Sequence, residues 1–115
     1  ITIPTTGSGF DYDVIWGDGS VASEGLTGDA THTYASVGTY TVMIYGDFPR
    51  IYFNDSGDKD KILSVEQWGD ILWSSMEDAF RGCTFLNVSA TDAPNLSNVN
   101  SLSRMFYFCT NLNSN

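Results

Sequence analysis

Apolar and polar residues alternate along the first part of the chain, and this alternation predicts two β-strands. In FDYDVIW, residues 10–16, every second residue is apolar: Phe10, Tyr12, Val14 and Trp16. Asp11 and Asp13 occupy the positions between them, so we expect one buried face and one face in water. The segment GTYTVMIYG, residues 38–46, repeats the pattern between two glycines and predicts a second strand. Shorter strands are predicted at residues 1–3 and 31–34.

The pattern changes after residue 48, where the chain contains an internal repeat. Residues 75–86 (SMEDAFRGCTFL) align with residues 101–112 (SLSRMFYFCTNL) at an offset of 26 positions, with identity at five of twelve. A period in the range of about 20–50 residues predicts a solenoid, in which each unit buries its apolar face against the next. Short helices are predicted at residues 74–82 and 101–108, and short strands at 50–54 and 86–90.

These patterns predict one α+β body with two parts. Residues 1–47 are expected to form a short antiparallel β unit. Residues 48–115 are expected to form about two and a half 26-residue units of a leucine-rich-repeat-type solenoid, which the β unit caps. No low-complexity linker separates the two parts, and Pro49 marks the corner between them.

Charge and composition exclude several classes of partner. The 115 residues include 14 acidic and 5 basic side chains, a net charge of -9 that repels nucleic acid and anionic lipid. No run approaches the roughly 18 apolar residues of a membrane span. The start, ITIPTTGSG, contains neither Met nor a signal-peptide pattern. We therefore expect the chain to be processed or cut from something longer.

Two family resemblances follow from these segments. VIWGDGS, residues 14–20, and HTYASVGTYTVMI, residues 32–44, resemble the polycystic-kidney-disease (PKD) domain, a β-sandwich. The match covers residues 1–46, although the earlier strands of that family are mostly missing. FRGCTFL and FYFCTNL, residues 80–86 and 106–112, resemble the BspA-like leucine-rich repeats of bacterial surface proteins. Together the resemblances imply adhesion or structural display without catalysis.

Asp18 and His32 are the first candidate site residues. Asp18 lies in a Gly-Asp-Gly sequence between two strands, where Asp and Gly favour a turn, and we prefer this role over ligand binding. His32 is the only histidine and has no nucleophile at a catalytic spacing, so we expect no catalytic residue. The PKD resemblance implies a structural role for it. Further structural residues are expected to be Trp16, Tyr34, Tyr40, Phe80 and Phe106.

The loop NDSGDKDK, residues 54–61, is a weak candidate for a calcium site. Asp55, Asp58 and Asp60 supply oxygen ligands, but the sequence fails the EF-hand register, and Lys59 and Lys61 offset the charge. A solvated loop is favoured, and we predict no metal and no cofactor.

Cys83 and Cys109 occupy equivalent repeat positions, so we expect them to lie next to each other. Parallel in-register side chains close a disulfide poorly, and buried free thiols are favoured. Trp68, Trp73 and Tyr107 are weak candidates for sugar stacking if they are exposed, although core packing is the commoner use of aromatic rings.

The predicted function is therefore a non-enzymatic module of an extracellular or cell surface that presents its repeat surface for adhesion or assembly. Its partners would be a protein or glycan on a cell or particle, with further repeats or another subunit at the C-terminal end. Nucleic acid and direct membrane insertion are not expected. Two alternatives remain: a structural or decoration protein of a phage head or tail, and a carbohydrate-binding module.

Overall fold

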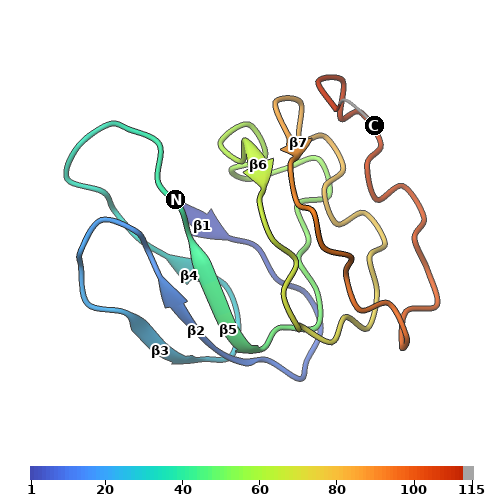
Figure 1. Ribbon diagram of the computed structural model, residues 1–115, viewed down its shortest axis with the longest axis horizontal. Helices are drawn as coiled ribbons and strands as arrows, with labels where there is room; N and C mark the ends of the chain where they lie inside the picture. The colour runs from blue at the N-terminus through green and yellow to red at the C-terminus, as the bar shows by residue number, and fades with distance from the viewer. Residues whose placement is uncertain (113–115) are drawn as a thin grey trace.

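Residues 1–112 form seven short β-strands in three small sheets (Figure 1). A computed structural model describes residues 1–112, and no helix occurs within this range. The strands are β1 (Thr2–Ile3), β2 (Asp11–Ile15), β3 (Ser23–Leu26), β4 (Ala30–Thr31), β5 (Met43–Asp47), β6 (Ser64–Val65) and β7 (Asn87–Val88). The longest run only five residues, so turns and loops form most of the chain.

The N-terminal region, residues 1–48, is antiparallel. Its main sheet has the order β3-β2-β5, and β1 pairs with β4 in a second sheet. The alternation in residues 10–16 predicted the burial correctly: Tyr12 and Val14 are buried, whereas Asp11 and Asp13 are exposed. Strands were predicted at the places of β1, β2, β4 and β5. Strand β3 was missed because SEGL has no apolar alternation.

The core continues from this sheet into the rest of the chain. The ring of Phe48 contacts that of Tyr12 at 4.8 Å and that of Trp73 at 6.0 Å between centroids. Backbone bonds also connect the regions, since the Tyr52 N–H donates to the Pro4 carbonyl at 3.1 Å. The buried apolar residues therefore form one hydrophobic cluster that extends from Ile3 to Leu86.

In the C-terminal region, three irregular segments lie beside one another: the inner segment (residues 49–56), the middle segment (74–86) and the outer segment (101–112). Backbone bonds connect each to the next, for example Phe53 N–H to Ala79 O at 2.9 Å and Phe80 N–H to Met105 O at 2.9 Å. Between the segments, β6 pairs in parallel with β7. In Figure 1 the outer segment, drawn in red, lies at the end of the molecule opposite β3.

The predicted α+β fold, a β unit capping a solenoid of short strands and helices, is wrong. The protein is all-β in its described part, with small sheets and turns, and the predicted helices at 74–82 and 101–108 are series of turns. The N–H groups of Met76 and Asp78 donate sideways to the carbonyls of Ser101 and Ser103, not along the segment as in a helix. The strand predicted at 50–54 is also absent.

Positive φ angles explain why no helix forms in these segments. Asp78 and Arg104, which occupy equivalent positions, have φ angles of 54° and 53°, and Phe108 has a φ of 63°. A right-handed helix requires negative φ at every residue, so each of these positions ends the helical path. The Asp78 and Arg104 conformations recur 26 residues apart, which shows that the sequence repeat corresponds to a repeated turn.

Candidate functional site

Asp18 organises the connection between β2 and β3. Gly17 and Gly19 on either side have φ angles of 86° and 81°, and the Asp18 carboxylate accepts bonds from the Ser20 N–H at 3.0 Å and the Ser20 hydroxyl at 2.5 Å. Its other oxygen lies 2.8 Å from Nε2 of His32. The Ser20 hydroxyl bond and the His32 bond hold the pKa of Asp18 well below its usual range. The contacts are those of a carboxylate that holds a turn.

Aromatic rings extend this cluster toward residues 34 and 40. The rings of Trp16 and His32 stack at 4.7 Å, and those of Tyr34 and Tyr40 stack at 4.0 Å. The Tyr34 hydroxyl donates to the Trp16 carbonyl at 2.7 Å, which connects the two pairs. The structure therefore brings together the five residues of this region that were expected to be structural.

This cluster contains Ser, Asp and His side chains, but their order does not suit nucleophilic catalysis. In a hydrolytic triad the histidine lies between the serine and the carboxylate, so that it can take the serine proton. Here the Asp18 carboxylate lies between Ser20 and His32. Ser20 donates to the carboxylate, and the ring nitrogen of His32 that faces the cluster bonds the same group.

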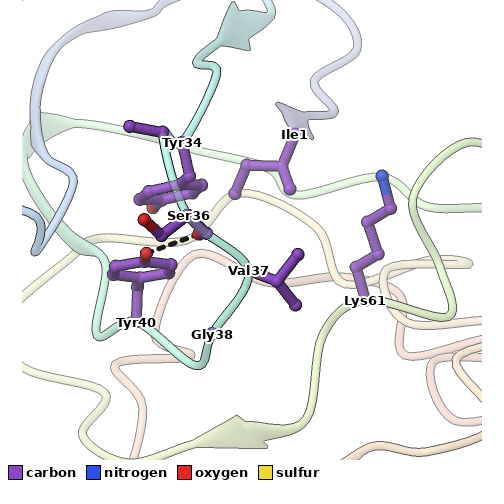
Figure 2. A pocket seen from close by; sticks show the side chains of 8 residues that line it. Ile1, Tyr34, Ser36, Val37, Gly38, Tyr40 and Lys61 are labelled. Atoms are coloured by element: carbon purple, nitrogen blue, oxygen red, sulfur yellow. Dashed lines mark hydrogen bonds between the residues drawn. The ribbon is translucent and has the colours of Figure 1, made fainter.

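A shallow hollow of about 380 Å³ lies beside the tyrosine pair (Figure 2). Tyr34 and Tyr40 form one side, while Val37 and Lys61 face it from the other. The Tyr40 hydroxyl donates to the Ser36 carbonyl at 2.6 Å, and Lys61 lies 3.2 Å from Asp58. Both tyrosine hydroxyls and the Lys61 ammonium beside the hollow are therefore already bonded, and they do not form an acid–base pair.

The acidic loop at residues 54–61 is held by lysines and by β1. Asp58 accepts a bond from the Thr2 N–H at 2.6 Å and pairs with Lys61. Burial alone would raise the pKa of Asp58, but these two contacts outweigh burial, and the pKa lies below its usual value. Lys59 lies within 3.7 Å of Asp55 and 3.5 Å of Asp60. Residues 1–112 contain no group of three acidic, His or Cys side chains arranged to hold a metal.

The three aromatic candidates for sugar stacking do not form one surface. Trp68 and Trp73 are buried, with 9% and 5% of their surface exposed, and their rings meet edge to face at 6.3 Å. Tyr107 is exposed and lies in the outer segment. The exposure that the glycan hypothesis requires is therefore absent for both tryptophans, because Trp73 packs on Phe48 and Trp68 on Phe80 in the core.

The two cysteines are free thiols in the C-terminal region. Cys83 is buried, and Cys109 is half-buried with its thiol donating to the Phe80 carbonyl at 3.0 Å. Burial raises the pKa of the Cys83 thiol to about 12, so the thiolate that reacts with electrophiles and metals is scarce near neutral pH.

The outer segment contains exposed groups that the sequence interpretation did not single out. Leu102 and Phe108 expose 53% and 55% of their surface, beside Tyr107 at 48%. Arg104 lies between Leu102 and Tyr107 in the sequence, and its Nε donates to the carboxylate of buried Asp78 at 3.0 Å. The sequence signal that could have found these groups was the 26-residue alignment. It pairs the basic Arg104 with the acidic Asp78, and the large apolar Phe108 with Gly82.

The described part of the chain also contains no helix that is long and apolar enough to cross a membrane. Neither a protein-family model nor a curated protein nor a solved structure matches this chain.

Proposed function

We propose that this chain is a non-enzymatic module of an extracellular surface, which binds or assembles with partners through its outer segment. The observation that supports this function is the apolar side-chain surface of that segment. Leu102, Tyr107 and Phe108 are each about half exposed on one twelve-residue stretch. Apolar side chains gathered at one end of a small protein are typical of an interaction site.

The other features of the molecule agree with binding rather than catalysis. The single histidine bonds Asp18, and the hydroxyls of the tyrosine pair bond backbone carbonyls. The net charge of -9 and the scarcity of basic residues suit display in an extracellular medium and disfavour nucleic acid as a partner. The resemblance of residues 14–20 and 32–44 to the PKD domain points in the same direction.

Adhesion can be tested with microspheres coated with the protein and passed over immobilised mucin, collagen and fibronectin. We expect the wild-type coating to raise retention about tenfold on at least one of these surfaces, an effect of roughly 1.4 kcal/mol. The variant Leu102→Ser/Tyr107→Ser/Phe108→Ser should return retention to that of uncoated spheres.

The matched control is Val21→Ser/Val37→Ser, which removes two apolar side chains that are 92% and 106% exposed elsewhere on the surface. It should retain full adhesion. If neither mucin, collagen nor fibronectin retains the spheres, or if both variants lose retention equally, the proposal is wrong.

A further inference from the structure

The middle segment donates a regular row of backbone hydrogen bonds to the outer segment. The donors are the N–H groups of Met76, Asp78, Phe80 and Gly82, and the acceptors are the carbonyls of Ser101, Ser103, Met105 and Tyr107. The distances are between 2.7 and 3.0 Å. Every second residue of the middle segment thus bonds its neighbour on the C-terminal side.

The equivalent donors of the outer segment have no such partner. A shift of 26 residues places Leu102, Arg104, Phe106 and Phe108 at the donor positions. None of these four N–H groups donates to a described residue, whereas the intervening N–H groups of Met105 and Tyr107 close turns within the segment. The outer segment therefore presents four backbone donors in the same arrangement that the middle segment uses for pairing.

The aromatic stack of the C-terminal region ends at a side chain of the outer segment. The Phe80 ring stacks between Phe53, at 6.3 Å, and Phe106, at 5.7 Å. Phe106 has a stacking partner on one side only among residues 1–112 and stays half-buried. Leu102, Tyr107 and Phe108 add exposed apolar surface beside it.

Charge adds a preference for one kind of partner. Arg104 contacts Asp78 through Nε at 3.0 Å and lies 3.9 Å from Glu77, yet about half of its side chain is exposed. The position equivalent to Arg104 in a further segment would lie next to it, as Arg104 lies next to Asp78. An acidic side chain there would satisfy the exposed part of the guanidinium.

A second copy of this chain does not fit the open edge. Two outer segments placed edge to edge would oppose N–H to N–H and Arg104 to Arg104. Their carbonyls at 101, 103, 105 and 107 already accept bonds from the middle segment. The inner segment of another copy is covered by the N-terminal region, because the Tyr52 N–H donates to the Pro4 carbonyl and Ile51 is buried.

We infer that the outer segment binds a polypeptide segment of the same turn conformation, which supplies carbonyls to the four N–H groups that donate to no described residue. The partner places an acidic residue beside Arg104 and an aromatic residue on Phe106. This inference rests on the proposed function and names the chemistry of its partner. The middle segment's own sequence meets both requirements, with Asp78 at the first position and Phe80 at the second.

The probe is therefore a synthetic peptide of residues 75–86, SMEDAFRGCTFL, added to the intact protein. Amide hydrogen exchange is followed by NMR with the peptide at about 1 mM, where a complex with a Kd of ~1 mM is half formed. We expect the exchange rate to fall about twofold at Leu102, Arg104, Phe106 and Phe108. A twofold fall is the limit because half of the protein is unbound at any time and exchanges at its free rate. The peptide SMEKAFRGCTFL, which places Lys beside Arg104, should bind several-fold more weakly.

Two protein variants separate the backbone donors from the apolar surface. Leu102→Pro removes one donor together with the side chain, whereas Leu102→Ala removes most of the side chain and keeps the donor. Leu102 is exposed, so both variants should fold. The proline variant should bind the peptide several-fold more weakly than the alanine variant.

Unchanged exchange at the four amides, or slowing elsewhere, would overturn the inference. Slowing that grows with protein concentration in the absence of peptide would also overturn it, because a second copy would then be the partner. The adhesion experiment fails or succeeds independently. Slower amide exchange with peptide but no retention of microspheres would reject adhesion and support the polypeptide partner. Retention of microspheres without slower exchange would support adhesion and reject the polypeptide partner.

Discussion

In the N-terminal region, β2 and β5 pair over five residues each, whereas the middle and outer segments contact each other through alternate amides of successive turns. The first arrangement uses alternating side chains to separate core from solvent. The second arrangement is built by repetition of a turn along one direction. The sheet ends at its edge strands β3 and β5, whereas the N–H groups of residues 102, 104, 106 and 108 in the outer segment bond no described residue in the positions that the middle segment uses for pairing.

The aromatic stack offers the largest test of this difference. We expect Phe80→Ala to lower the free energy of unfolding by about 3–5 kcal/mol, because a 2% exposed ring between Phe53 and Phe106 leaves a cavity. Phe106→Ala at the equivalent position should cost about 1–2 kcal/mol, since that ring is only half-buried. Urea unfolding followed by circular dichroism measures both. Equal losses would show that the outer segment is as enclosed as the middle one.

A smaller effect is expected in the β2–β3 connection, where the turn approaches other backbone. Gly17→Ala would place a Cβ 2.3 Å from the Thr41 carbonyl oxygen at a φ of 86°, and should cost about 2–3 kcal/mol. Gly19→Ala, at a φ of 81° in open space, should cost about 1 kcal/mol. Urea unfolding again provides the comparison. The same loss for both variants would mean that close contact with Thr41 does not constrain this turn.

The smallest effect concerns acid stability. The pKa of Asp18 is held below its unfolded value of about 3.9, so the folded state binds fewer protons than the unfolded state just below that pH. The stabilisation is complete above about pH 4 and is lost as the pH falls toward the folded pKa. Asp18→Asn should flatten the fall in stability between pH 4 and pH 2, measured by urea unfolding at each pH.

Asp47→Asn is the control, because Asp47 is exposed on β5 and forms no hydrogen bond or ion pair through its side chain within residues 1–112. It should leave the acid slope unchanged. An unaltered slope in Asp18→Asn would show that the bonds from Ser20 and His32 contribute nothing to the acid limb.

The sequence predicted the structure well where the alternation of side chains within one strand determines which of them are buried. It predicted the structure poorly where hydrogen bonds to a neighbouring segment determine the conformation. The alternation around Tyr12 and Val14 was sufficient to locate β2 and its buried face. The spacing around Met76 and Phe80 looked helical, but both N–H groups bond another segment. Sequence patterns do not reveal that Asp78 and Arg104 adopt positive φ, since neither residue type requires it.

The candidate site shows the same division. A structural role was expected for Trp16, His32, Tyr34 and Tyr40, but the sequence did not predict that their rings contact one another. Trp68 and Trp73 could not be separated from Tyr107 by sequence, because only packing shows which rings are covered. The free donors of the outer segment were also invisible, since a backbone N–H is identical at every non-proline position.

The sequence by itself determined the positions of β1, β2, β4 and β5, the 26-residue correspondence and the excess of negative charge. These properties depend on the type and order of side chains along the chain. Only the tertiary structure decided that the repeated segments form turns, that two tryptophans are buried and that four N–H groups of the outer segment bond no described residue. Each of these depends on which distant segment lies alongside, because backbone hydrogen bonds and buried surface are shared between neighbours.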